Sequence, residues 1–117
     1  MKTQPLNLFG PGATFHHVGL VVADIDATAP GVEKTHDPIQ RVNVAFLDLH
    51  GEIVELIEPA GENSPVAANL KKGQKLVHLC YEVPEMKSAL AAGEEKGCRQ
   101  VSEPAPAAAF EDRKSVV

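Results

Sequence analysis

The sequence predicts an α+β fold in a single domain that spans residues 1–117. Two observations lead to this prediction. Segments with the alternation and β-branched content of strands are interspersed with segments that carry helix start and stop signals, and one strand-to-helix unit occurs twice along the chain. The length is sufficient for one modest hydrophobic core and too small for two independent ones.

The first predicted elements are a strand and a helix that ends early. The leader up to Gly12 is interrupted by prolines and glycines and is expected to be a tail or a short edge element. Residues 15–22 are rich in aliphatic and β-branched side chains and predict a strand. Asp24 is a suitable N-cap for a following helix, which Pro30 and Gly31 break at once.

A hairpin is predicted after this interrupted helix. Residues 42–47 alternate as a strand does, His50-Gly51 forms a plausible tight turn, and residues 53–57 complete the hairpin before Pro59. His36 lies in the connector that precedes the hairpin. We therefore expect His36 and His50 to be solvated side chains in a loop and a turn.

The second half of the chain begins with a polar connector and then repeats the strand-to-helix pattern. Residues 61–74 form the connector, with a possible short helix over residues 65–70. Residues 76–83 predict a strand, and a helix follows from residue 84 to about residue 96, where Gly97 ends it. The chain closes on residues 115–117, which have the pattern of a strand's first residues.

The two strand-to-helix units align without a gap at a constant offset of 61 residues. The alignment places FHHVGLVVADIDA over LVHLCYEVPEMKS and matches His17 with His78 and Asp24 with Glu85. Apolar positions of two amphipathic segments can match by chance, but a histidine at the head of both strands is harder to explain in that way. We infer two related units.

Strand periodicity then gives the direction of these side chains. With a period of two, His17 and Gly19 share one face of the first strand, and His78 and Cys80 share one face of the second. If a pseudo-twofold axis relates the units, both histidines face one cavity. His16 is expected on the opposite face from His17, as a packing or surface residue.

Glu55 is the acidic candidate for the same cavity, because it is flanked by apolar residues in the segment VELI. An unpaired carboxylate in such a strand would be costly. His17, Glu55 and His78 together would suit a divalent cation such as Zn, Co, Ni, Mn or Fe(II). The simpler alternatives are a hydrogen-bonded core histidine for His17 and an edge-strand carboxylate for Glu55.

The amino-acid composition limits the classes of partner that we expect for this chain. The formal net charge of −5 disfavours phosphate backbones and anionic membranes, and the aromatic content of 4% without tryptophan disfavours single-strand nucleic-acid binding. Two cysteines are too few for a disulfide framework. With no signal-peptide pattern or membrane-spanning run in the sequence, we expect a cytoplasmic protein without nucleic-acid or membrane partners.

Three segments of the chain resemble the vicinal oxygen chelate superfamily, which includes glyoxalase I, extradiol dioxygenases and bleomycin-resistance proteins. They are HHVGLVVADIDA, RVNVAFLDLHGEIVELIEPAGENSPVAANL and KLVHLCYEVPEMKSALAAGEEKGCR. The order VAFLDL, VELIEP, SPVAANL and VHLCYEV is most similar to the methylmalonyl-CoA epimerase branch. The resemblance implies paired βαβββ modules in a cupped mixed sheet, with residues 13–60 as the first module, 61–74 as the connector and 75–117 as the second.

The resemblance also implies a site. His17, Glu55 and His78 occupy the positions of three metal ligands, and Glu33 lies near an acidic residue of the epimerases, which makes it a candidate catalytic base. The fourth ligand of the family is a glutamate on the last strand, which this sequence does not reach, and the first module is about ten or more residues short. Either the protein is a degenerate member of the family or the given sequence omits segments, and we favour omission because VELIEP and VHLCYEV are intact.

The activity implied is that of a metal-dependent isomerase or lyase that stabilises an enolate, most similar to methylmalonyl-CoA epimerase. The alternatives are a lactoylglutathione lyase-like enzyme, an extradiol dioxygenase, and a metal-free protein that binds a small molecule such as an antibiotic. The expected partners are a small-molecule substrate such as an acyl-CoA and a second copy of the chain in a homodimer. Lys71, Lys72 and Lys75 could meet the phosphates of an acyl-CoA, but we expect them to be solvated side chains at a helix end.

Overall fold

The secondary-structure elements follow the predicted order closely. In chain order they are β1 (Thr14–Val21), α1 (Ile25–Thr28), β2 (Thr35–Asp37), β3 (Val42–Leu49), β4 (Glu52–Pro59), α2 (Ala67–Lys71), β5 (Leu76–Val83), α3 (Met86–Glu95) and β6 (Ser115–Val116). The computed structural model describes residues 1–103 and 115–116. Every predicted strand and helix has a counterpart among these elements.

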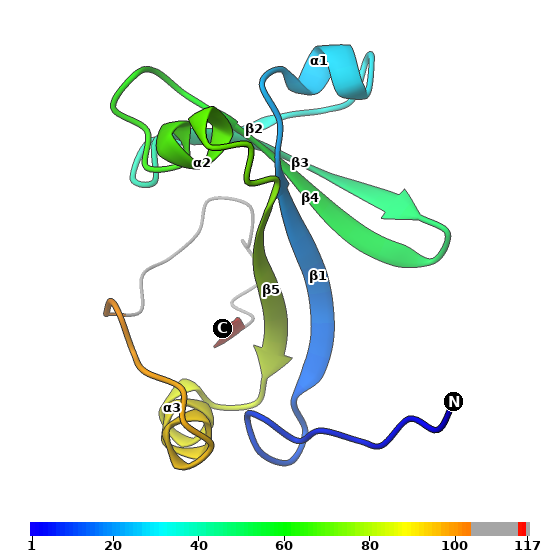
Figure 1. Cartoon of the computed structure of the whole chain (residues 1–117), viewed down its shortest axis with the longest axis vertical. Coiled ribbons are helices and arrows are strands. Elements are labelled where there is room, and N and C mark those ends of the chain that lie inside the picture. The colour runs from blue at the N-terminus through cyan, green and yellow to red at the C-terminus, as the bar shows by residue number, and fades with distance from the viewer. Residues whose placement is uncertain (104–114, 117) are drawn as a thin grey trace.

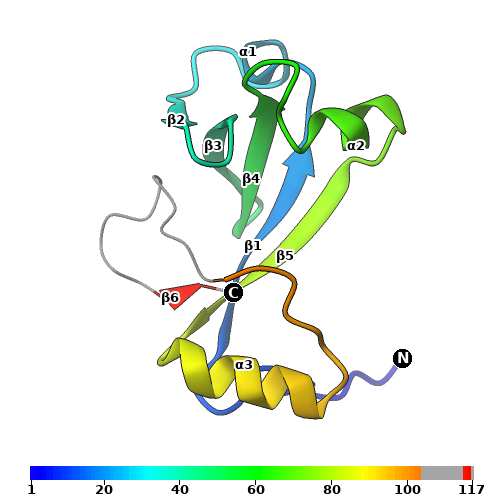
Figure 2. The same cartoon turned by 90° about the vertical axis from the view of Figure 1, so that its left-hand side faces the viewer.

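The strands form one mixed sheet in the order β2-β3-β4-β1-β5-β6, counted over the described residues (Figure 1). β1 pairs in parallel with β4 on one side and antiparallel with β5 on the other. The two related halves of the chain therefore meet at the pairing of β1 with β5. α1 and α2 lie toward one end of the sheet and α3 lies at the other end (Figure 2).

The first half of the chain keeps the order strand, helix and three strands in a shortened form. Asp24 caps α1 by accepting a hydrogen bond from the backbone N–H of Asp26 at 2.9 Å, and the helix ends before Pro30. β2 has three residues and pairs antiparallel with β3. The prediction that His36 lies in a loop is wrong, because His36 lies in β2, where its Nδ1 is 2.8 Å from Oδ1 of Asn43.

The hairpin of β3 and β4 has the predicted turn. His50 and Gly51 both adopt positive φ, at 55° and 94°, as a type I′ turn requires. The backbone N–H of Gly51 also donates to Oδ1 of Asp48 at 2.7 Å. The turn therefore fixes the register in which Phe46 lies opposite Glu55.

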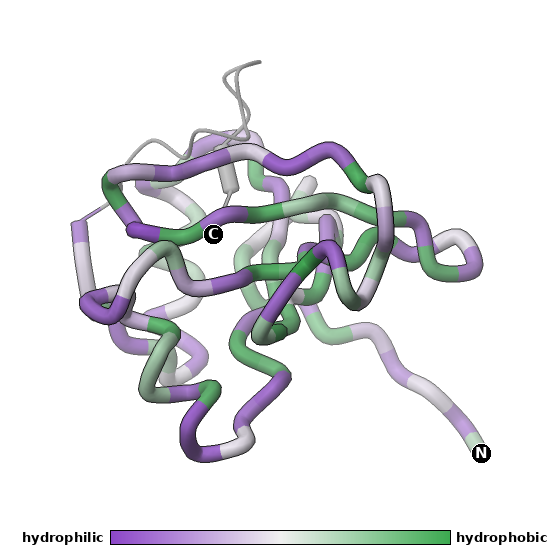
Figure 3. The backbone as a smooth tube through the Cα atoms, turned by 90° about the horizontal axis from the view of Figure 1, so that it is seen from above, coloured by the Kyte–Doolittle hydropathy of each residue, from purple (hydrophilic) through white to green (hydrophobic). Residues whose placement is uncertain are grey.

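Apolar side chains pack on both faces of the sheet. One cluster contains Val21, Val42, Val44 and Ile57, and side chains of the α2 region pack against it. The opposite face carries a cluster around Ile25, the first residue of the short helix α1, whose side chain is completely buried. Figure 3 shows apolar segments gathered in the middle of the molecule and hydrophilic segments along its periphery.

The leader is partly anchored. Residues 1–7 are exposed, and the trace of the N-terminus extends away from the body (Figure 1). The ring of Phe9, however, packs edge-on against Tyr81 with the ring centroids 5.1 Å apart, and it lies against Gly93 of α3. The leader thus covers one end of the second unit.

Among the described residues, no helix combines the length and apolarity that a membrane crossing requires.

Candidate metal centre

Three neighbouring strands bring the predicted ligands together. His17 lies on β1, Glu55 on β4 and His78 on β5, and Gly19 is the register partner of both Glu55 and His78. Because β1 lies between β4 and β5, side chains that point to the same face of these three strands must converge. One donor atom from each of the three residues lies within 4.8 Å of the other two.

The three donor atoms form a nearly equilateral triangle. Nε2 of His17 lies 3.1 Å from Oε1 of Glu55 and 3.0 Å from Nε2 of His78, and the third edge, from Nε2 of His78 to Oε1 of Glu55, is 3.0 Å. Around a cation bound at about 2.1 Å, neighbouring ligands stand about 3.0 Å apart in octahedral and about 3.4 Å apart in tetrahedral coordination. The observed spacing matches one face of an octahedron.

The chemistry of the donor set also fits a cation. Each imidazole Nε2 carries either a proton or a lone pair, and the carboxylate oxygen carries lone pairs only. If only one of the two Nε2 atoms carries a proton, the other Nε2 and the carboxylate oxygen face each other with lone pairs. If both Nε2 atoms carry protons, their two N–H groups face each other. A cation shared by all three atoms satisfies every edge at once. Two histidines and a carboxylate suit borderline divalent ions.

Burial strengthens the electrostatic interactions between Glu55 and the two histidines. His17 is 1% exposed and Glu55 is 9% exposed. Burial by itself raises the pKa of Glu55, but hydrogen bonds from His17 and His78 and the positive charge on these rings outweigh it, so the pKa of this carboxyl lies below its ordinary value. Glu55 is therefore held as an anion, which is the form that binds a metal.

His17 and His78 differ in their surroundings. The His17 ring packs edge-on against Phe46, with the ring centroids 5.2 Å apart. The side chain of His78 is 38% exposed, and its ring lies directly over Gly19, where an added Cβ would be 2.3 Å from Cε1 of His78. A glycine at this position gives the His78 ring the space it needs to reach the other two ligands.

A cavity of about 580 Å³ opens beside the triangle and includes Glu55 and His78 in its lining. Apolar side chains make up much of its wall, and Gln40 and Asn69 contribute polar groups. The full lining is Gln40, Val42, Val44, Glu55, Ile57, Pro65, Val66, Asn69, Val77, His78 and Val101. A small molecule in this cavity could reach the two ligands that face it, while His17 stays behind them.

The remaining predicted site residues lie elsewhere. Glu33 is exposed in the connector between α1 and β2 and is not among the described residues that line the cavity. Lys71, Lys72 and Lys75 are exposed at and after the end of α2. The structure thus brings the three predicted ligands together but does not place the predicted base beside them.

His16 is the residue that the alternation rule misplaces. The register of β1 against β5 shifts between Phe15 and His17, so the strict alternation of faces is lost at His16. Nδ1 of His16 consequently lies 2.8 Å from Nδ1 of His17, and the prediction that His16 points to the opposite face is wrong. The doubled histidine was the only signal in the sequence for this contact.

The comparisons with known proteins identify the family of the chain. The family described as "Glyoxalase/Bleomycin resistance protein/Dioxygenase superfamily" matches residues 16–116. Among curated proteins, the ethylmalonyl-CoA/methylmalonyl-CoA epimerase of Cereibacter sphaeroides is 33% identical over 95 residues, which cover 72% of this chain and 71% of that protein.

Solved structures give the same result. A hypothetical protein from Bacillus halodurans superposes with a TM-score of 0.67 at 25% identity and covers 83% of this chain and 78% of its own. A variant of the methylmalonyl-CoA epimerase of Streptomyces coelicolor, in complex with 2-nitronate-propionyl-CoA, superposes with a TM-score of 0.58 at 27% identity and covers 76% of this chain and 73% of its own. The α+β fold is therefore shared with proteins of this kind.

Proposed function

The chain belongs to the glyoxalase/bleomycin resistance protein/dioxygenase superfamily, and from that premise we propose that it is a metal-dependent isomerase that epimerises the α-carbon of methylmalonyl-CoA or a closely related thioester. The observation that carries the proposal is the triangle of donor atoms from His17, Glu55 and His78 beside a cavity. Relatives named as epimerases of such thioesters support the choice of substrate class.

His17, Glu55 and His78 would hold a divalent cation. Bound there, the cation would supply Lewis-acid stabilisation of the enolate that forms when a proton leaves the carbon next to a thioester carbonyl. With both imidazoles neutral, the three ligands carry a single negative charge. A net positive charge then remains to attract the two oxygen functions of a malonyl-type group.

The cavity wall suits the rest of such a substrate. Val42, Val44 and Ile57 present an apolar surface next to Glu55 that can take the methyl branch and exclude water. Gln40 and Asn69 offer amide groups to the thioester carbonyl or to the start of the pantetheine arm. Water exclusion strengthens every charge interaction at the reacting carbon.

We also propose Glu33 as the group that removes the α-proton. The proposal rests on its position in the sequence, because it lies in the short connector between α1 and β2, near the place where the epimerases have an acidic residue. The exposed connector would have to approach the cavity when substrate binds. Changing Glu33 to glutamine should then lower kcat and leave metal affinity unchanged, whereas the exposed control Glu62→Gln should alter neither.

The decisive assay combines metal content with isotope exchange. The purified protein, its His17→Ala, His78→Ala double variant and the control His36→Ala are loaded with Co²⁺ or Mn²⁺ and incubated with one epimer of methylmalonyl-CoA in D₂O. We expect deuterium at the α-carbon and the opposite epimer with the wild type and the control, and neither with the double variant. Equal metal content or equal exchange in wild type and double variant would refute the proposal.

The same preparation distinguishes the main alternatives. The hemithioacetal of glutathione tests a lactoylglutathione lyase-like reaction, in which the enolate is formed from a hydroxy thioether and not from a malonyl thioester. Turnover of the hemithioacetal without exchange on methylmalonyl-CoA would move the assignment to the lyase. Tight binding of a small molecule that is independent of the three ligands would favour a sequestering protein.

A further inference from the structure

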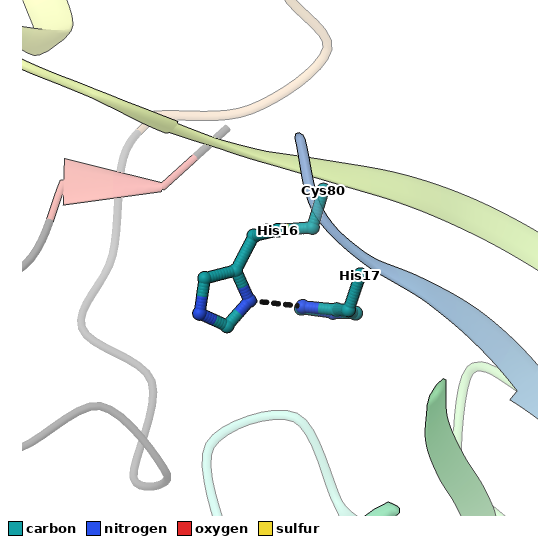
Figure 4. Close-up of side chains that lie close together, drawn as sticks. All are labelled: His16, His17 and Cys80. Atoms are coloured by element: carbon teal, nitrogen blue, oxygen red, sulfur yellow. Dashed lines mark hydrogen bonds between the residues drawn. The ribbon is translucent and has the colours of Figure 1, made fainter. Parts of the chain in front are cut away.

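A second group of potential metal ligands shares His17 with the first. His16, His17 and Cys80 each offer one donor atom, and these atoms all lie within 4.8 Å of one another. Nδ1 of His16 is 2.8 Å from Nδ1 of His17, and Cys80 is the register partner of His17 on β5 (Figure 4). The irregularity in β1 brings the two adjacent histidines together, and β5 brings the thiol across to them.

We propose that His16, His17 and Cys80 form a second cation site, specific for thiophilic ions such as Zn²⁺, Cd²⁺ or Cu⁺. The donor set differs in kind from the first site. A thiolate with two imidazoles is a soft set that favours these ions, whereas a carboxylate with two imidazoles also accepts harder ions such as Mn²⁺. Cys80 is 7% exposed, so a bound ion would be shielded from water on that side.

The two sites share one imidazole, and this sharing makes them compete. His17 presents Nε2 to the triangle with Glu55 and His78, and Nδ1 to His16. A neutral imidazole has one lone pair, and its other nitrogen carries the proton. An ion bound at Nδ1 therefore displaces the proton to Nε2, and an N–H group at Nε2 cannot ligate a second ion. Binding at Cys80 also releases the thiol proton to solvent.

The consequence is a built-in sensitivity to soft metals. A hard divalent ion in the triangle fixes the His17 proton on Nδ1, where it donates to Nδ1 of His16. A thiophilic ion in the second site reverses this arrangement and removes His17 from the triangle. The inference concerns metal binding alone and holds whether or not the chain acts on an acyl-CoA.

The test uses a Cys98→Ser background, because Cys98 is an exposed thiol that would bind soft metals by itself. Titration with Cd²⁺ is followed by the ultraviolet charge-transfer absorption of a thiolate–cadmium bond. We expect one equivalent per chain. Cys80→Ser should abolish the absorption, and His16→Ala should weaken Cd²⁺ binding by about 10-fold or more. No absorption at one equivalent, or equal affinity in His16→Ala, would overturn the proposal.

Competition is measured in the same background with Mn²⁺, whose unbound form is counted by electron paramagnetic resonance. Saturating Mn²⁺ should raise the Cd²⁺ concentration needed for the charge-transfer absorption, and Cd²⁺ that produces this absorption should release bound Mn²⁺. Simultaneous full occupation by both ions would refute the shared imidazole. Glu55→Gln separates this result from the proposed function, since it should remove Mn²⁺ binding and keep the thiolate–cadmium absorption.

Discussion

The two histidines that the repeat aligns occupy very different surroundings. His17, from the first unit, is 1% exposed, touches Phe46, and has a polar neighbour at each ring nitrogen. His78, from the second unit, has a side chain that is 38% exposed and lines the cavity. At equivalent positions of the repeat, one histidine is therefore a buried anchor and the other is accessible from the cavity. Residues at aligned positions of a repeat therefore need not contribute equally to the stability of the protein.

The largest effect should come from His17→Ala. The change opens a void in a fully buried position, removes a hydrogen bond to Glu55, and deletes a metal ligand. We expect the free energy of unfolding of the metal-free protein to fall by about 2–4 kcal/mol. Chemical denaturation followed by circular dichroism measures this loss. If the free energy of unfolding falls no further in His17→Ala than in His78→Ala, the proposed difference between the buried and the accessible histidine is wrong.

His78→Ala should sharpen the comparison from the other side. Since the ring is partly exposed, we expect little change in unfolding free energy but a loss of more than about 100-fold in metal affinity, because even changes to residues around a ligand cost 10- to 100-fold. Competition with a coloured chelator gives the affinity. The control is His36→Ala, which removes an exposed imidazole outside the site. A strongly destabilised His78→Ala would contradict the assignment.

The acidic ligand between the two histidines predicts a pH dependence. The lowered pKa of Glu55 means that the folded state binds fewer protons than the unfolded state near and below the ordinary carboxyl value of 4.5. The stability that this carboxylate contributes is therefore complete above that pH and is lost as the pH falls through the lowered pKa. Urea denaturation of metal-free wild type and Glu55→Gln should show a difference in stability that shrinks on acidification. A constant difference would argue against a depressed pKa.

The helix caps of the two units give a smaller contrast. Asp24 caps α1 and Glu85 caps α3, and the repeat aligns these two residues. Oε1 of Glu85 accepts from the N–H of Ser88 at 2.9 Å and from its hydroxyl, and these bonds lower the pKa of Glu85. Glu85→Ala should speed amide exchange in the first turn of α3. Asp24→Ala should do less in α1, because Glu58 also accepts from the N–H of Ile25 at 2.7 Å. An equal or larger effect of Asp24→Ala would reverse this order.

The smallest expected effect is that of Gly19→Ala. An added Cβ would lie 2.3 Å from the His78 ring, so the partly exposed ring must shift. Because His78 can move toward the cavity, we expect metal affinity to fall by no more than about 10-fold, within the range for changes next to a ligand. Isothermal titration with Mn²⁺ measures the change. A complete loss of binding would mean that His78 is as rigidly held as His17.

Much of the fold and the proximity of His17, Glu55 and His78 could be predicted from the sequence. The strands have clear apolar alternation, and β5 spans the predicted residues without any difference. His17 and His78 were linked by the repeat, and Glu55 by its position between apolar neighbours. These are local signals, and local periodicity is what a single sequence conveys well.

The residues that the sequence analysis misplaced depend on contacts between distant segments. His16 turned toward His17 because of an irregular pairing with β5, which no alternation rule contains. β2 has three mostly polar residues and exists as a strand because it pairs with β3. Phe9 packs on Tyr81 although its surroundings in the chain look like a loose tail. The position of Glu33 relative to the cavity likewise depends on a connector with no periodicity.

The central place of β1 in the sheet has a consequence for assembly of the molecule. Each of the three candidate ligands belongs to a different strand. The two related halves of the chain meet where β1 pairs with β5. An ion bound by all three would cross-link the two halves, and its binding free energy would add to the free energy of their association. Chelation should then loosen the β1–β5 pairing first, well before either half comes apart.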